Sequence, residues 1–157
     1  MTDPLTLKPM DEADLDWVMS VERRVYVRPW GRRGFELALD EGLNYVIVRG
    51  SGTHEQPVGY VICRPVVDEV ELLNFCIAPP FQRQGLGRRA LKILLERWVE
   101  QGWQRALLEV RVSNPARTLY RSLGFDEDGV RPNYYPGDRP GSEREDACLM
   151  SCDLSVH

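Results

Sequence analysis

The hexapeptide Gln82-Arg83-Gln84-Gly85-Leu86-Gly87 joins an apolar run, Val70 to Ala78, to an amphipathic run that follows at once. Its two glycines let backbone N–H groups approach an anion without interference from Cβ atoms. A helix that starts here would also point its positive dipole end at the same place. The pattern therefore favours a seat for a pyrophosphate, with a plain glycine turn as the alternative.

The chain after this loop alternates between helical and strand-like patterns. Apolar residues recur at helical spacing from Gly87 to Gly102, and period-two alternation over Ala106 to Val112 predicts a strand. A second helix is expected from Asn114 to its stop at Gly124. Phe125 begins another strand, and a loop from about Gly129 to Glu143, long enough to be functional or disordered, should precede a last strand, Asp146 to Leu154.

The chain before the loop is predicted to be a strand, two helices and a hairpin. Leu5 to Lys8 alternates as an edge strand does, and a helix is expected from Asp11 to about Val25, followed by a short one around Phe35. Leu43 to Arg49 and Val58 to Val66 then form the hairpin. This order of elements predicts a mixed α/β (α+β) sheet covered by helices.

Length and composition fit one domain spanning residues 1–157. No apolar run approaches the roughly 20 residues of a membrane span, and the N-terminus lacks the pattern of a secretory signal, so we expect a cytoplasmic protein. The net charge of −4 argues against nucleic-acid binding. Four cysteines without a Cys-x-x-Cys pair argue against a zinc site, and no metal is expected. They are Cys63, Cys76, Cys148 and Cys152.

Two motifs resemble those of the GNAT superfamily of acetyl-CoA-dependent N-acetyltransferases. Gln82 to Gly87 is similar to its pyrophosphate loop, Gln/Arg-x-x-Gly-x-Gly/Ala, and Leu119-Tyr120 with Leu123-Gly124-Phe125 is similar to its Leu-Tyr-x-x-x-Gly-Phe signature. Both motifs in the right order are more specific than either alone. The resemblance implies the GNAT fold, a mixed, mostly antiparallel sheet of six to seven strands flanked by about four helices.

A closer resemblance is to the RimI family, bacterial enzymes that acetylate the N-terminal alanine of small-subunit ribosomal protein eighteen. It extends from about Val21 to Leu154 and implies the N-terminal peptide of a ribosomal protein as acceptor, with the enzyme a monomer or weak dimer. The residues that carry it are Pro29-Trp30, Asn74, Gln82 to Gly87, Glu109-Val110-Arg111, Ser113-Asn114, Asn133-Tyr134-Tyr135 and Glu145-Asp146-Ala147.

The same resemblance implies acetyl-CoA as cosubstrate, held at the pyrophosphate by the loop and at the pantetheine arm by backbone groups of the preceding strand, as an added strand would be. The implied contacts are Phe75, Cys76, Ile77, Gln82, Arg83, Gln84, Gly85, Leu86, Gly87, Arg88 and Asn114. The chain is one residue shorter than RimI-like chains between Asn114 and Tyr120. Because Tyr120 keeps its spacing to Gly124, we expect the start of the helix to absorb the deletion.

Two residues match catalytic positions of the family. Glu109 would accept the proton of the acceptor amine, directly or through water, although a strand carboxylate paired with Arg111 is the plain alternative. Tyr120 would donate a proton to the departing CoA thiolate, with an aromatic core residue as the alternative. The acceptor groove is implied at Pro29, Trp30, Asn74, Asn133, Tyr134 and Tyr135.

Three other functions stay open at this point. The same fold acetylates lysine side chains, polyamines or drug amines, and a binding-only module would hold acetyl-CoA without turnover. The third is an NAD-binding oxidoreductase, because Gly85 to Ala90 also fits Gly-x-Gly-x-x-Gly/Ala and Glu109 lies about 20 residues further on.

Overall fold

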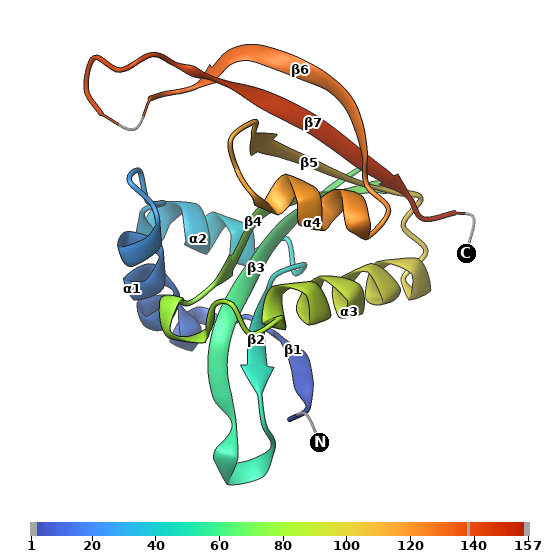
Figure 1. The fold of residues 1–157 in the computed structure, drawn as a ribbon. Coiled ribbons are helices and arrows are strands. Elements are labelled where there is room, and N and C mark those ends of the chain that lie inside the picture. Colours follow the sequence, from blue (N-terminus) through green and yellow to red (C-terminus); the bar gives the residue numbers. More distant parts are fainter. Residues whose placement is uncertain (1–2, 138, 156–157) are drawn as a thin grey trace.

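The computed structural model describes residues 3–137 and 139–155 and is built around one seven-stranded sheet, in the order β1-β2-β3-β4-β5-β7-β6 (Figure 1). All neighbouring strands of this sheet run antiparallel except β4 and β5, which run parallel. The predicted mixed, mostly antiparallel sheet is therefore confirmed. The strands are β1 (Leu5–Pro9), β2 (Tyr45–Arg49), β3 (Gln56–Val66), β4 (Glu69–Ile77), β5 (Arg105–Arg111), β6 (Asp126–Tyr135) and β7 (Glu145–Asp153).

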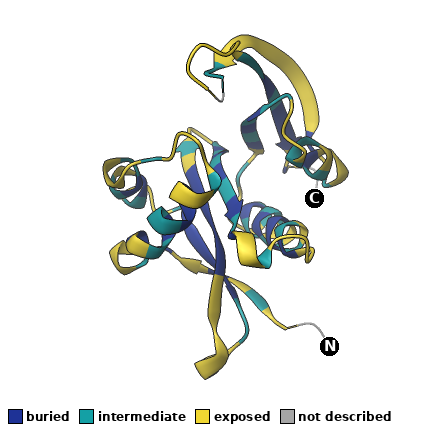
Figure 2. Ribbon diagram, turned by 60° about the vertical axis from the view of Figure 1, so that its left-hand side comes forward, coloured by how far each residue is buried: buried dark blue, intermediate teal, exposed yellow. Residues whose placement is uncertain are grey.

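The described part of the chain has four α-helices, two on each face of the sheet (Figure 1). The buried side chains of α1 (Leu15–Val25) and α2 (Arg32–Leu39) pack on one face, and those of α3 (Leu86–Glu100) and α4 (Ala116–Ser122) on the other. None of them is long and apolar enough to cross a membrane. β4, in the middle of the sheet, is thus covered on both sides, whereas the edge strand β6 is exposed (Figure 2).

One prediction about the elements is wrong. The first part of the loop expected from Gly129 to Glu143 is strand, because β6 continues to Tyr135 and pairs with β7, and the connection between the two strands begins only after Tyr135. Pro132 favoured a loop in the sequence because proline usually ends a strand. Here it lies on an edge strand, between Arg131 and Tyr135 where the register shifts, so its missing N–H disrupts no ladder.

The topology also excludes the NAD-binding alternative. A dinucleotide-binding fold is a mostly parallel, doubly wound sheet in which the first strand leads straight into the glycine turn. Here the sheet has a single parallel pair, and a 3-10 turn, Pro79–Phe81, separates β4 from Gly85.

β4 contains a bulge that reverses which of its side chains face which layer. Ile62 of β3 pairs with Asn74 while Cys63 pairs with Leu72, so Leu73 is the extra residue. Before the bulge, Leu72 packs with the α3–α4 layer, and after it Asn74 and Cys76 turn toward α1 and α2.

Pairing between β4 and β5 ends at the same point. The last paired residues are Leu72 and Leu108, although β4 continues to Ile77 and β5 to Arg111. The edge of β4 that faces β5 is therefore without a paired strand from Leu73 to Ile77, and the two strands part there.

Candidate active site

The loop between β4 and α3 has the backbone geometry of an anion seat. Arg83 and Gly85 both adopt left-handed conformations, with φ of +64° and +77°. Such a conformation strains a residue that has a Cβ, and strain of this kind gathers at functional sites. Gly85 caps α3 without a side-chain acceptor, so the first N–H groups of the helix are left for an external one.

Most side chains of this loop brace it rather than face outward. Gln82 Nε2 donates to the Ile77 carbonyl at 2.8 Å, Gln84 Oε1 accepts from Arg49 at 3.0 Å, and Arg88 donates to Ser122 Oγ at 2.7 Å. The guanidinium of Arg83 makes no hydrogen bond, ion pair or ring contact with another described residue. Arg83 is therefore a positive charge of the anion seat that is left for an external partner.

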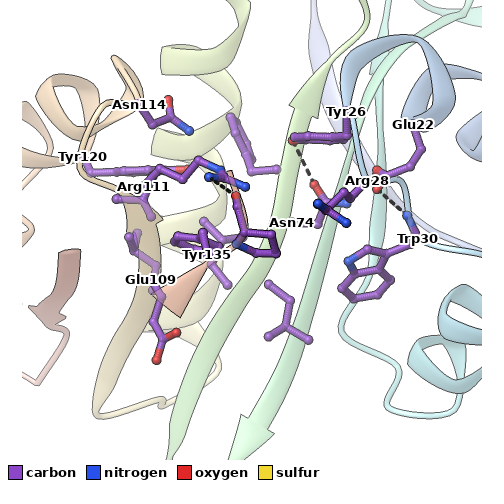
Figure 3. A pocket seen from close by; sticks show the side chains of 16 residues that line it. Glu22, Tyr26, Arg28, Trp30, Asn74, Glu109, Arg111, Asn114, Tyr120 and Tyr135 are labelled. Carbon is purple, nitrogen blue, oxygen red and sulfur yellow. Dashed lines mark hydrogen bonds between the residues drawn. The ribbon is translucent and has the colours of Figure 1, made fainter. Parts of the chain in front are cut away.

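A cavity of about 400 Å³ opens where β4 and β5 part (Figure 3). Seven residues predicted for the site line it, which are Trp30, Asn74, Phe75, Glu109, Asn114, Tyr120 and Tyr135. Pro29, Asn133, Tyr134 and the loop residues 82–88 do not line it. The cavity thus holds both residues predicted to be catalytic and lies apart from the anion seat.

One wall of the cavity depends on Glu22, a residue that the sequence reading did not select. Its carboxylate is 1% exposed and accepts hydrogen bonds from three groups of different segments. The Trp30 backbone N–H donates to it at 2.9 Å, Asn74 Nδ2 at 2.8 Å and the Tyr60 hydroxyl at 2.5 Å. Tyr26 adds a hydrogen bond to Asn74 at 3.2 Å. This network fixes the segment after α1 against β4.

A signal for Glu22 was present in the sequence. It follows Val18 by four positions and Val21 by one, so it lies on the buried stripe of α1. A carboxylate at such a position must be paired or hydrogen-bonded, which makes it a candidate for an organising role. Arg28, which also lines the cavity, carried no comparable signal, whereas Arg111 was singled out by the resemblance and as the alternative partner of Glu109.

The opposite wall includes Glu109 and Arg111, and each of them is paired with an oppositely charged side chain that lies outside the cavity. Arg131 lies 3.1 Å from Glu109 and stacks over the ring of Tyr134 at 4.8 Å. Arg111 lies 3.3 Å from Glu145 and over the ring of Tyr135 at 4.7 Å. The Glu109 carboxylate is therefore paired with Arg131 and not with Arg111, the partner that the plain alternative named.

The Glu109 side chain points away from Tyr120 in this arrangement (Figure 3). It is 22% exposed, so water reaches it while Arg131 holds it on the β6 side. A proton passing between the cavity and this carboxylate would use a water molecule or a change of rotamer.

Tyr120 is buried on α4, with its ring 5.7 Å from that of Phe125. Burial, with a smaller contribution from Tyr135, raises the pKa of Tyr120 to about 12. The hydroxyl has no hydrogen-bond partner among the described residues. The Tyr120 hydroxyl therefore stays protonated at neutral pH, and no described residue accepts a hydrogen bond from it.

The start of α4 is the segment that we expect to absorb the missing residue before Tyr120. Asn114 Oδ1 accepts the N–H of Ala116 at 2.9 Å, and the helix begins directly after Pro115. The Tyr120 side chain still reaches the cavity, and Asn114 lines it as well.

Cys76 has the environment of a packed thiol. It is 4% exposed on the α1–α2 side of β4, and burial raises its pKa to about 11. The four cysteines are free and buried. No three His, Cys, Asp or Glu side chains within residues 3–137 and 139–155 are placed to hold a metal ion.

Comparison with known proteins gives one family. Residues 12–125 match the family model described as acetyltransferase (GNAT) family. The [ribosomal protein bS18]-alanine N-acetyltransferase of Haemophilus influenzae is 34% identical over 148 residues, covering 94% of this chain and 98% of that protein. The enzyme of the same name from Escherichia coli K12 is 35% identical over 152 residues, covering 96% and 99%.

A solved structure agrees with these relatives. The crystal structure of the ribosomal-protein-S18-alanine N-acetyltransferase from Escherichia coli superposes with a TM-score of 0.85 at 33% identity, covering 98% of this chain and 96% of that one. The likeness therefore extends over the sheet, both helical layers and the C-terminal hairpin.

Replacing Glu22 tests the network that holds the cavity wall. Glu22→Ala leaves the donors of Trp30, Asn74 and Tyr60 without their acceptor, and we expect it to lower the free energy of unfolding by about 2–4 kcal/mol. The matched control is Glu36→Ala on α2, whose carboxylate has no partner among the described residues and whose loss should cost less than about 0.5 kcal/mol. Urea denaturation measures both, and equal losses would contradict the assigned role.

Proposed function

The chain belongs to the GNAT acetyltransferase family, and from this premise we propose that it transfers the acetyl group of acetyl-CoA to the N-terminal alanine of ribosomal protein bS18. The observation that carries the proposal is the likeness, over 96% of the chain, to the Escherichia coli enzyme named for that reaction. The acceptor is the N-terminal peptide of the ribosomal protein, and the reaction takes place in the cytoplasm, where that protein is made.

The anion seat suits the pyrophosphate of CoA. The N–H groups at the start of α3 and the Arg83 guanidinium would hold it, because both are without partners in the described part of the chain. The pantetheine arm would lie along the edge of β4, where backbone groups of Phe75, Cys76 and Ile77 face no paired strand. When bound, acetyl-CoA supplies an acetyl group already activated as a thioester.

The acceptor would enter between the Glu22 wall and Tyr135. Trp30 and Asn74 are fixed there by Glu22, so they form a rigid surface for the first residues of a peptide. Pro29, Asn133 and Tyr134, outside the cavity, would contact the peptide only beyond those residues.

Glu109 is proposed as the base and Tyr120 as the acid. An α-amino group with a pKa of about 7.7–8.0 is mostly protonated at pH 7 and must lose a proton before it attacks. Glu109 would take that proton through water, because Arg131 holds its carboxylate away from Tyr120. Tyr120 would donate to the departing thiolate, and attack is direct, without an acetylated enzyme.

The choice of acceptor is tested with three substrates and acetyl-CoA. We expect one acetyl group, located by fragment mass spectrometry on the α-amine of a peptide that begins with alanine and carries an internal lysine. The same peptide with a blocked N-terminus, and spermidine, should not react. Acetylation of the lysine or of spermidine would favour the alternative acceptors, and binding of acetyl-CoA without any transfer would favour the binding-only module.

Glu109→Gln removes the proposed base and should lower kcat by about 100-fold with the affinity for acetyl-CoA unchanged. The matched control is Glu71→Gln on β4, which also neutralises an ion-paired strand carboxylate but lies outside the cavity. Steady-state kinetics and calorimetry measure the two quantities. A similar fall in both variants would show that charge loss alone is responsible.

Tyr120→Phe should lower kcat by about 100-fold by removing the proton donor, whereas Tyr134→Phe, outside the cavity, should not. Because the pKa of Tyr120 is raised to about 12, the phenol stays protonated through pH 10. The wild-type kcat/KM should therefore rise as the acceptor amine deprotonates near pH 8 and then stay level to pH 10. A fall between pH 8 and 10 that Tyr120→Phe abolishes would contradict the raised pKa, and an unchanged kcat in Tyr120→Phe would contradict the role of proton donor.

A further inference from the structure

Free cations are unevenly distributed on this protein. In the described ranges, most arginine and lysine side chains are engaged by a carboxylate, a carbonyl, a polar side chain or an aromatic ring. The side chains without a hydrogen bond, ion pair or ring contact to another described residue are those of Arg23, Arg24, Arg28, Arg33, Arg83, Lys92 and Arg139. Arg83 belongs to the anion seat. Most of the others lie between the end of α1 and the start of α2.

Three of these residues, Arg23, Arg24 and Arg28, form what we call the arginine rim. All three are exposed, and Arg28 lines the cavity on its acceptor side (Figure 3). Arg32 is left out because Asp16 pairs with it, and Arg33 because it shares a small cavity with acidic residues of the same region.

No acidic side chain is available to neutralise the rim from within its own segment. The acidic residue beside it is Glu22, whose carboxylate is buried and already occupied by three donors. Those hydrogen bonds also hold the segment in place. The rim is therefore a fixed, uncompensated positive surface at the acceptor mouth of a protein whose net charge is −4.

Helix stabilisation explains only part of this pattern. Arg23 and Arg24 lie in the last turn of α1, where cations interact favourably with the helix dipole. Arg28 lies beyond the end of that helix, so the dipole does not account for it. A basic acceptor peptide does not account for the rim either, because like charges would repel.

We propose that the rim binds phosphate groups of RNA next to the acceptor N-terminus, so that the enzyme modifies a ribosomal protein already bound to RNA. The proposal rests on the proposed function, which places the acceptor on a ribosomal protein. Arginine forks match phosphate oxygens in pairs, and all three rim cations are arginines. The net charge led us to expect no nucleic-acid contact, but its distribution leaves this one surface positive.

The test compares two double variants with the same change in net charge. Arg23→Glu with Arg24→Glu reverses the rim outside the cavity, and Lys92→Glu with Arg139→Glu reverses two free cations elsewhere. Each is assayed on the N-terminal peptide of bS18 and on small ribosomal subunits that lack the acetyl group. We expect peptide kcat/KM within twofold of wild type for both, and at least a tenfold loss on subunits for the rim variant alone.

Salt dependence gives a second readout. Each lost phosphate contact makes the slope of log affinity against log salt less negative by close to one unit. The rim variant should therefore bind a labelled small-subunit RNA fragment with a slope that is less negative than that of wild type by about 2. Fluorescence anisotropy measures it for both variants and wild type.

Several outcomes would overturn the proposal. Equal losses in both double variants, or no loss on subunits, would remove the rim from acceptor recognition. Loss on subunits with unchanged RNA affinity would assign the rim to an acidic protein surface instead. If the wild-type enzyme fails to acetylate the peptide, the proposed function fails, while the anisotropy measurement still decides whether the rim binds RNA.

Discussion

The parting of β4 and β5 beyond Leu72 and Leu108 is the constraint on which the rest of the site depends. An extra residue, Leu73, turns Asn74 toward α1, where Glu22 holds it. Because the strands no longer pair, backbone groups of β4 are left for a ligand and a cavity forms between the strands. The bulge on one side of β4 and the end of pairing on its other side thus coincide at Leu72 and Leu73.

The second wall of the cavity shows how the C-terminal hairpin completes the site. Glu109 lies on β5, but its orientation is set by Arg131 of β6, which is separated from β5 in the sheet by β7. A second ion pair, between Arg111 and Glu145, joins β5 to β7 in a similar way. The proposed base therefore reaches its position only once β6 and β7 have joined the sheet, so the reactive geometry depends on contacts distant in sequence.

The limits of prediction follow from this dependence. The helices, the hairpin and the Gln82–Gly87 loop were predictable because spacing and glycine content encode them locally. The extent of β6 was not, because an edge strand tolerates Pro132 where an inner strand would end. The Glu22 network and the partner of Glu109 were not either, since both join strands and helices whose register no local pattern records. Of these residues, only Glu22 could have been identified from the sequence, because it is a carboxylate on the apolar stripe of a helix.

The charged residue proposed for catalysis is paired within the protein, whereas the charged residues proposed for binding are not. The carboxylate proposed to accept a proton is paired with Arg131, which holds it on the β6 side. In contrast, Arg83 at the anion seat and Arg28 at the acceptor side make no hydrogen bond, ion pair or ring contact with another described residue, although both belong to a protein of net charge −4. Since no carboxylate of the described residues pairs with Arg83 or Arg28, the position of each is set by the backbone of its own segment. Their presence at opposite ends of the site is most simply explained if external anions, the CoA pyrophosphate at one end and RNA phosphate at the other, neutralise them during the reaction.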